Sequence, residues 1–259
     1  MSVIDLSRVT EIIREVGQSE ILPRFRNLEA HQIREKGPGN LVTEADIEAE
    51  RQLGRRLSEL MPGSVVVGEE AVAADHKVLA ALAGNDPVWI LDPVDGTANF
   101  AHHRPVFGVI VALAMEGTTV AGWIHDPLSD TTAVAAAGEG AWIGDRRLHV
   151  AEERQLSAMA GSLGYRKDPY VAAQVQRLVR NGSVAHDYLA LAEGRLDFAC
   201  YRRLMPWDHA AGVLLHSEAG GWNALLDGSP YHPVPAATGV LLAPGEASWV
   251  RIRDLIAAR

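Results

Sequence analysis

Two short apolar runs, each followed at once by acidic residues, constrain this chain of 259 residues more than any other feature. Val65 to Val67 and Val88 to Leu91 are bounded by polar residues, which is typical of buried strands. The first run leads into Gly68-Glu69-Glu70, and the second leads into Asp92 and Asp95. Buried strands that both end in carboxylates predict a shared acidic pocket.

The segment from Trp89 to Phe100 is the most informative part of the sequence, because it delivers Asp92 and Asp95 on one turn. Pro93 fixes its own φ and restricts the preceding aspartate, so both carboxylates can converge. Gly96 and Thr97 then open a predicted short helix whose free N–H groups form an anion site. Carboxylates beside an anion site repel a phosphate unless a cation such as Mg²⁺, which takes oxygen ligands, lies between them. Taken alone, the two aspartates are equally consistent with turn and capping residues.

Three further acidic segments have simple explanations when each is taken alone. Glu69 and Glu70 are either a solvated loop or a metal ligand with a supporting partner. Asp208 begins a predicted helix, where the helix dipole stabilises an acid whatever its function. Thr43 and Asp46 are explained equally well as an ordinary pair at a helix start.

Periodicity and glycine or proline punctuation predict the remaining elements. The predicted helices are a first one through Val9–Val16 that Pro23 ends or kinks, a second from Thr43 to Met61-Pro-Gly63, then 170–179, 186–192, 208–219 and a final helix to Arg259. Strand-like runs separated by glycines from Val106 to Val150 predict an antiparallel meander. Further strands are predicted at 158–163, 196–201 and 239–243, and residues 36–40 are predicted as a loop.

The two halves of the chain differ in the order in which predicted helices and strands follow one another. Residues 1–150 predict an α+β half that carries most of the acidic residues named above. Residues 151–259 predict an α/β half that carries Asp208. Because no repeat, low-complexity tract or flexible linker separates them, we expect the halves to pack closely.

Composition excludes several classes of protein. A net charge of −9 argues against a surface that neutralises nucleic-acid phosphates. Cys200 is the one cysteine, so no intrachain disulfide can form and a reducing compartment fits. The first residues lack a secretory signal, and the longest apolar run, Val106 to Met115, falls short of the roughly 20 residues that span a bilayer. We therefore expect a cytoplasmic protein with neither a nucleic-acid nor a membrane partner.

The order of the acidic motifs resembles that of the inositol monophosphatase family, whose members are Mg²⁺-dependent, lithium-sensitive phosphomonoesterases. The motifs are Gly-Glu-Glu70, then Asp92-Pro-Val-Asp-Gly-Thr-Ala-Asn-Phe100, then Trp207-Asp-His-Ala-Ala-Gly212. The resemblance extends from Asn40-Leu-Val-Thr-Glu-Ala-Asp46 to Glu218-Ala-Gly-Gly221. It implies a layered αβαβα sandwich of the sugar-phosphatase type, hydrolysis of a small phosphate monoester, and a homodimer.

The resemblance also implies the metal ligands. Glu69, Asp92 and the backbone carbonyl of Val94 would hold one Mg²⁺, while Asp92, Asp95 and Asp208 would hold a second. Glu70 would steady a further, weaker ion or its water. Lys36 either adds charge at the mouth of the site or is a solvated loop lysine.

The catalytic and substrate-binding residues follow from the same resemblance. Asp46 would hydrogen-bond the Thr97 hydroxyl, and this pair, with Glu69, would direct a water for in-line attack on phosphorus. The substrate-binding residues would be Asp95, Gly96, Thr97, Gly182, Ser183, Val184, Tyr201 and Asp208.

Tyr201 departs from the family pattern, since inositol-preferring members carry a glutamate seven residues before the helix-starting aspartate. Loss of inositol preference and simple packing of Tyr201 at the end of a strand are both consistent with the substitution. His186 and Arg202 lie close in sequence to positions that could contact an acidic or aromatic leaving group, and each is also explained as a surface residue. The open substrates are an inositol monophosphate, another sugar or polyol phosphate, histidinol phosphate and 3′-phosphoadenosine 5′-phosphate; a regulatory or binding role is the alternative from another class.

Overall fold

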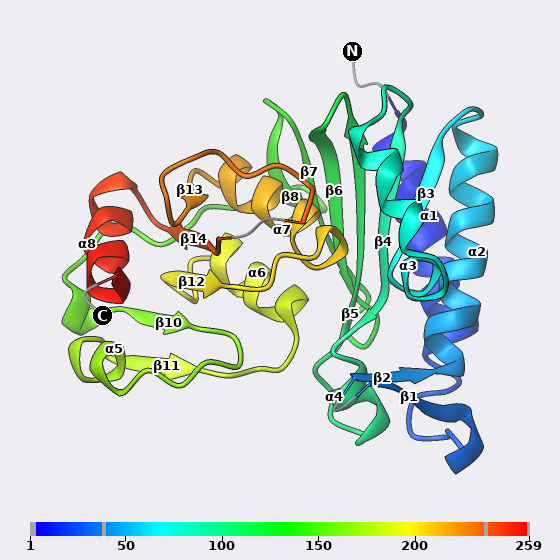
Figure 1. Ribbon diagram of the computed structural model, residues 1–259, viewed down its shortest axis with the longest axis horizontal. Helices are drawn as coiled ribbons and strands as arrows, with labels where there is room; N and C mark the ends of the chain where they lie inside the picture. Colours follow the sequence, from blue (N-terminus) through cyan, green and yellow to red (C-terminus); the bar gives the residue numbers. More distant parts are fainter. Residues whose placement is uncertain (1–3, 38–39, 236–237, 258–259) are drawn as a thin grey trace.

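The computed structural model describes residues 4–37, 40–235 and 238–257. Five layers follow one another across the molecule (Figure 1). The layers are helices α1 (Leu6–Val16) and α2 (Glu44–Leu60), a seven-stranded sheet, helices α6 (Val184–Ala192) and α7 (Pro206–Glu218), a five-stranded sheet, and helices α5 (Pro169–Gln174) and α8 (Glu246–Ala257). The predicted αβαβα layering is confirmed.

The seven-stranded sheet has its strands in sequence order. They are β3 (Val65–Gly68), β4 (Val88–Asp95), β5 (Gly108–Met115), β6 (Thr118–Asp126), β7 (Thr131–Ala136), β8 (Gly140–Ile143) and β9 (Arg146–Arg147). The run from β5 to β9 is the predicted antiparallel meander, and β4 also pairs antiparallel with β5. Strand β3 instead runs parallel to β4, with Gly68 paired to Leu91, so the residues that follow these two positions leave the sheet at the same edge.

The five-stranded sheet has the order β11-β10-β12-β14-β13 and mixes parallel with antiparallel pairs. Its strands are β10 (Ala160–Ser162), β11 (Arg177–Val179), β12 (Phe198–Tyr201), β13 (Trp222–Leu225) and β14 (Val240–Ala243). The remaining elements are the hairpin β1 (Ile33–Gly37) and β2 (Asn40–Thr43), helices α3 (Glu69–Ala74) and α4 (Thr97–Ala101), 3-10 segments Ala30–Gln32, His76–Ala83 and Leu156–Ala158, and a π-helical turn Gly17–Ile21.

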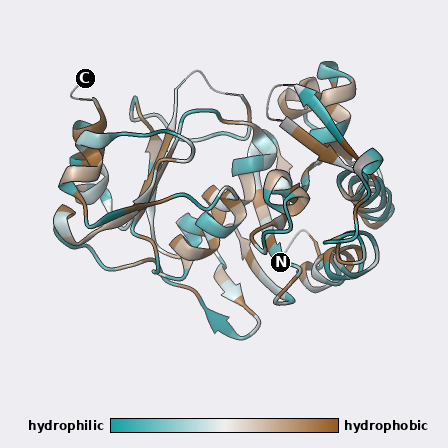
Figure 2. Cartoon of the chain, turned by 90° about the horizontal axis from the view of Figure 1, so that it is seen from below, coloured by the Kyte–Doolittle hydropathy of each residue, from teal (hydrophilic) through white to brown (hydrophobic). Residues whose placement is uncertain are grey.

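Three apolar clusters fill the spaces between the layers, and hydrophobic residues follow the interior strands and helix faces in Figure 2. The cluster between the two sheets is packed tightly around α7. A Cβ added to Gly122 of β6 would lie 2.8 Å from the Cα of Ala211, and one added to Gly212 would lie 2.2 Å from the Tyr188 ring. Because the glycines permit this close approach, α7 is fixed against the first sheet and against α6.

Several sequence predictions were wrong in detail. Residues 36–40 are not a simple loop: Lys36 and Gly37 belong to β1 and Asn40 begins β2, while 38 and 39 lie outside the described residues. The helix predicted at 170–179 ends at Gln174, because residues 177–179 pair with β10 as an edge strand. Strand β13 was not predicted. These strands are short and lie at a sheet edge or in a hairpin, so they lack a repeated apolar pattern.

The division into halves at about residue 150 stays a prediction. The strands of the first sheet lie within 65–147 and those of the second within 160–243. The apolar cluster between the sheets nevertheless takes residues from both halves. Among the described helices none has the length and apolar character that crossing a membrane requires.

His216 on α7 is a buried histidine that the fold keeps neutral. Its side chain is fully buried, and its Nε2 has no hydrogen-bond partner among the described residues. Burial lowers the pKa of His216 to about 3. The folded protein therefore binds fewer protons here than the unfolded chain, whose histidine pKa is about 6.5, and the resulting stability is complete above pH 6.5 and is lost as the pH falls.

We expect His216→Leu to become more stable relative to the wild type as the pH falls, because the variant has no unfolded-state histidine to protonate at this position. Between pH 7.5 and pH 5 the difference in free energy of unfolding should move by about 2 kcal/mol in favour of the variant. Urea denaturation of both proteins at the two pH values measures this difference. A difference that does not change with pH would show that His216 is not held neutral.

Candidate active site

A cavity of about 480 Å³ opens between the edge of the first sheet, the start of α6 and the start of α7. One wall carries the acidic residues predicted as metal ligands. The segments that follow β10 and β12 line the cavity as well. The lining residues that enter the argument are the acids Glu69, Asp92, Asp95 and Asp208, and the residues Tyr165, Arg166, Tyr201, Arg202 and Arg203.

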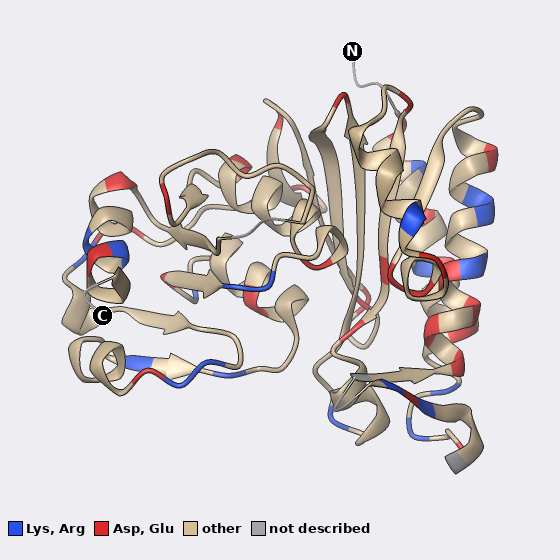
Figure 3. Cartoon of the chain, viewed as in Figure 1, with Lys and Arg blue, Asp and Glu red and all other residues tan. Residues whose placement is uncertain are grey.

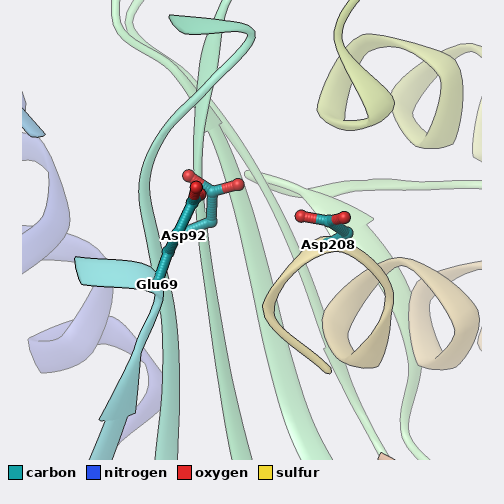
Figure 4. A group of neighbouring side chains, drawn as sticks. All are labelled: Glu69, Asp92 and Asp208. Atoms are coloured by element: carbon teal, nitrogen blue, oxygen red, sulfur yellow. The ribbon is translucent and has the colours of Figure 1, made fainter. Parts of the chain in front are cut away.

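Glu69, Asp92 and Asp208, referred to below as the acid trio, lie together as the sequence predicts. Each offers a carboxylate oxygen within 4.8 Å of the other two (Figure 4). The parallel β3–β4 register brings Glu69 beside Asp92, and the N-terminal turn of α7 brings Asp208. Burial raises the pKa of Asp92 well above its usual range, and the charge of Glu69 raises it further. Burial and Glu69 raise the pKa of Asp208 in the same way.

The donor set of the acid trio fits a hard divalent cation. Carboxylates this close repel one another unless a positive charge lies between them. Asp92 Oδ1 accepts a hydrogen bond from the Val94 N–H at 3.1 Å, which holds that carboxylate in place. Oxygen-only ligands from three separate segments are the type that Mg²⁺ binds.

Lys36 pairs with the two glutamates and is not a solvated lysine. Its Nζ donates to Glu69 Oε1 at 2.7 Å and to Glu70 Oε1 at 2.8 Å. Burial lowers the pKa of Lys36, but the two glutamates outweigh that effect and the net shift is upward. Glu70 is therefore directed to the ammonium group and lies outside the acid trio.

Glu50, which the sequence analysis missed, fixes the start of α3. Its Oε2 and Oε1 accept the N–H groups of Glu70 and Ala71, each at 2.8 Å. A Cβ added to Gly68 would lie 2.2 Å from Glu50 Cδ, so a side chain at position 68 would displace this carboxylate. Burial raises the pKa of Glu50 to about 7. A glutamate inside an amphipathic helix looks like a surface residue in sequence, and the glycine before Glu69 is the signal that could have drawn attention to it.

Asp46 makes both of the contacts that the sequence left open, one within the cap of α2 and one with the Thr97 hydroxyl. Its Oδ2 accepts hydrogen bonds from the Thr43 N–H at 2.8 Å and the Thr43 hydroxyl at 2.5 Å, which completes the capping box of α2. Its Oδ1 lies 3.1 Å from the Thr97 hydroxyl, which also lies 3.0 Å from the Val94 carbonyl oxygen. Burial raises the pKa of Asp46 to about 7, although the bonds from Thr43 oppose that rise.

Asp95 faces α6 instead of the acid trio. Its Oδ1 accepts the Val184 N–H at 3.1 Å, and its Oδ2 accepts the Ala185 N–H at 2.8 Å and a short bond from the Ser183 hydroxyl. Burial raises the pKa of Asp95 to about 6, in spite of these bonds. Asp95 thus ties the metal-side turn to the start of α6.

Two glycines let the segments around Asp95 approach each other. Gly96 and Gly182 have φ values of +84° and +72°, in the left-handed region that favours glycine. A Cβ added to Gly96 would lie 3.0 Å from the Val106 carbonyl oxygen and 3.2 Å from the Gly182 carbonyl oxygen. The predicted substrate-binding residues 96–97 and 182–184 are therefore brought together at one side of the cavity.

Asp187 organises part of the cavity lining and was also missed. Its Oδ2 accepts bonds from the Tyr201 hydroxyl at 2.8 Å and the Ser162 hydroxyl at 2.7 Å, and its Oδ1 accepts from Asn181 Nδ2 at 2.6 Å. Tyr201 is buried, and its ring centroid lies 5.0 Å from that of His209. Tyr201 thus packs at the end of β12 and lines the cavity as well.

A model described as the Inositol monophosphatase family matches residues 5–258. The chain belongs to this family. A curated relative named inositol-1-monophosphatase, from Rhizobium meliloti, is 32% identical over 97% of this chain and 95% of its own length. Among solved structures, an IMPase of Thermotoga maritima is 26% identical with a TM-score of 0.84, covering 98% of this chain and 96% of that one. An IMPase/NADP phosphatase complexed with Mg²⁺ and phosphate, 19% identical, shares the fold with a TM-score of 0.81 over 98% of this chain and 95% of that one.

The chain is thus a phosphoric monoester hydrolase of the inositol monophosphatase family, with the layered fold of that family. Family members use a divalent metal, and the acid trio supplies a matching set of ligands here. The roles of the individual site residues stay predictions. His186, considered for the leaving-group side, instead has its Nε2 3.1 Å from the Phe107 carbonyl oxygen.

We expect Glu50→Ala to lower the free energy of unfolding by about 2–4 kcal/mol, because two partly buried N–H groups lose their acceptor. Glu48→Ala is the matched control on the same helix. It removes an exposed ion pair with Arg51 at 2.6 Å, which should cost about 0.5 kcal/mol or less. Urea denaturation measures both values. Equal effects of the two substitutions would remove Glu50 from the support of the site.

Proposed function

We propose that this family member hydrolyses a small phosphate monoester with Mg²⁺ held at the acid trio. The observation that carries the proposal is the convergence of three carboxylates, from three segments far apart in sequence, to within 4.8 Å on the wall of one cavity. Burying these groups without a cation is unfavourable, as the raised pKa values of Asp92 and Asp208 indicate.

Glu69, Asp92 with the Val94 carbonyl, and Asp208 are the groups we propose as metal ligands. Bound Mg²⁺ would neutralise these carboxylates, admit a dianionic ester beside them and make a nearby water more acidic. Asp95 and Glu70 are further ligands in this proposal, taken from the family resemblance.

The protein's own residues would direct the water and take up its proton. The Thr97 oxygen would accept a hydrogen bond from a water aligned with the phosphorus. As the water attacks, its proton passes to Thr97 Oγ1, whose own proton passes to Asp46 Oδ1, 3.1 Å away. Asp46, with a pKa raised to about 7, suits that task near neutral pH. Glu69 is proposed to assist as a second acceptor, and the Gly96 and Thr97 N–H groups to bind phosphate oxygens.

Inositol monophosphate is the substrate in the name of the Rhizobium meliloti relative, and it is one of the candidates here. Tyr201 stands where inositol-preferring members carry a glutamate, and its hydroxyl already donates to Asp187. A polyol therefore loses one carboxylate acceptor, which keeps sugar phosphates, histidinol phosphate and 3′-phosphoadenosine 5′-phosphate as candidates. Lithium sensitivity, a homodimer and a cytoplasmic location stay predictions.

Asp208→Asn should weaken Mg²⁺ binding at least about tenfold and lower phosphatase turnover about 1,000-fold, because one negative charge leaves the acid trio. Isothermal titration with Mg²⁺ and release of inorganic phosphate measure the two effects. Asp227→Asn is the control, since Asp227 is exposed and bonds only to nearby Ser229 in the described structure. Wild-type affinity and turnover in Asp208→Asn would contradict the proposed metal site.

Thr97→Val should lower kcat about 100-fold, because valine keeps the shape of threonine but cannot relay a proton. Thr97→Ser should retain most of the activity, since it restores the hydroxyl. The Mg²⁺ affinity of both variants should stay near the wild-type value. If the Thr97→Val and Thr97→Ser variants turned over equally fast, the hydroxyl would have no part in the reaction.

A further inference from the structure

Asn99 is a buried residue that has no part in the proposed metal site or in the proposed proton transfer. It lies on α4, two residues after Thr97, and is 5% exposed. Its Nδ2 donates to three backbone carbonyl oxygens, those of Val106 at 2.8 Å, Asn181 at 2.9 Å and Gly182 at 3.1 Å. A side-chain amide has two N–H bonds, so both are engaged and one is shared. Asn99 therefore joins the chain before β5 to the chain before α6.

These contacts fix the orientation of two peptide units before α6. In a trans peptide unit the N–H of one residue points opposite to the C=O of the residue before it. The described residues contain no cis peptide bond. Because the carbonyl groups of Asn181 and Gly182 face Asn99, the N–H groups of Gly182 and Ser183 point away from it. Neither of these two N–H groups has an acceptor among the described residues.

The segment that Asn99 binds is part of the cavity lining. Gly182 and Ser183 line the cavity, whereas Asn99 does not. Gly182 has a φ of +72°, and a Cβ added to it would lie 3.2 Å from Asn99 Nδ2, so a side chain there would crowd the amide. The carbonyl groups thus face a residue outside the cavity lining, while the segment itself belongs to the lining.

Two acids hold the same segment through other groups. Figure 3 shows acidic residues at the end of β4 and on the first turn of α6, and these elements carry Asp95 and Asp187. Asp95 accepts the Ser183 hydroxyl and the N–H groups of the two residues that follow, and Asp187 Oδ1 accepts Asn181 Nδ2 at 2.6 Å. Since Asp95 is a proposed metal ligand and Asn99 lies outside the acid trio, replacing Asn99 tests the segment without removing a ligand.

We propose that Asn99 is a positioning residue for the alcohol part of the substrate. It turns the N–H groups of Gly182 and Ser183 into the cavity, where they donate to hydroxyl oxygens of that alcohol. The inference rests on the proposed function and adds the residue that prepares this side of the cavity. Thr97 and Asn99 lie on the same short helix, so one element places both the attacking water and the donors for the leaving alcohol. Donors that are oriented beforehand lower the entropy that binding costs.

The test compares kcat/KM for a hydroxylated ester with kcat/KM for phenyl phosphate, whose phenyl group has no hydroxyl for these donors. The hydroxylated ester is the most rapidly hydrolysed of inositol 1-phosphate, fructose 1-phosphate and adenosine 3′-monophosphate, with Mg²⁺ present. Asn99→Ala removes the amide, and Asn99→Leu fills its place with an apolar group. The ratio of the two kcat/KM values should fall about 10- to 100-fold in these variants, mainly through KM of the hydroxylated ester, because about two hydrogen bonds are weakened.

Trp249→Phe is the matched control. It removes a buried N–H donor to a backbone carbonyl, that of Leu241 at 2.9 Å, at a position that does not line the cavity. The ratio should therefore stay at the wild-type value. Isothermal titration should also give a near wild-type Mg²⁺ affinity for the Asn99 variants, since they keep the acid trio. Melting temperatures show which variants are folded, and Asn99→Leu replaces Asn99→Ala if alanine leaves the fold too weak.

An equal loss of kcat/KM for both kinds of ester, or a loss of Mg²⁺ affinity of the same size, would show a merely structural role for Asn99 and overturn the inference. Hydrolysis of phenyl phosphate but of none of the hydroxylated esters by the wild type would overturn it as well, while leaving the phosphatase proposal intact. If no ester in the panel were hydrolysed, the proposed function would fail and this inference with it.

Discussion

Repulsion between neighbouring carboxylates is the constraint on which this site depends. Parallel pairing of β3 with β4 sets Glu69 beside Asp92, and α7 adds Asp208 to the same space. Three negative charges at that spacing are tolerated in a partly buried site when a cation compensates them. Lys36 supplies part of that charge through Glu69, and a divalent ion would supply the rest. The fold therefore holds three carboxylates at a spacing that is unfavourable without a cation and suited to binding a divalent metal.

Glycines at points of close approach between elements hold the site in place. Gly122 and Gly212 let α7 lie close to the first sheet and to Tyr188, which fixes the helix that carries Asp208. Gly68 makes room for Glu50, whose carboxylate binds the first N–H groups of α3. In each case the absence of a Cβ lets a neighbouring element set the position of an acidic residue. The acid trio is thus held by packing between layers as much as by the local turns.

The sequence predicted the acid trio because strand ends and a helix start carry information about position. Asp92 and Asp208 occupy such places, and the order of their motifs matched a family. Glu50 and Asp187 escaped prediction because most of their partners lie 14 or more residues away in sequence, and nothing in their own neighbourhood marks them. The orientation of Asp95 toward α6 likewise depends on a contact across 88 to 90 residues of sequence. Periodicity predicted most of the strands and helices and the family resemblance predicted their layering, but neither predicted single contacts of this kind.

The buried network around Asp187 bears on the charge of the cavity. Its carboxylate would be the natural partner for a nearby guanidinium, yet Ser162, Asn181 and Tyr201 all donate to it. With its acceptor sites so occupied, Asp187 has little remaining capacity to accept further hydrogen bonds from a ligand. Where inositol-preferring members carry a glutamate, Tyr201 contributes a neutral donor that is already bonded to Asp187, so the carboxylate acceptor is absent at this position.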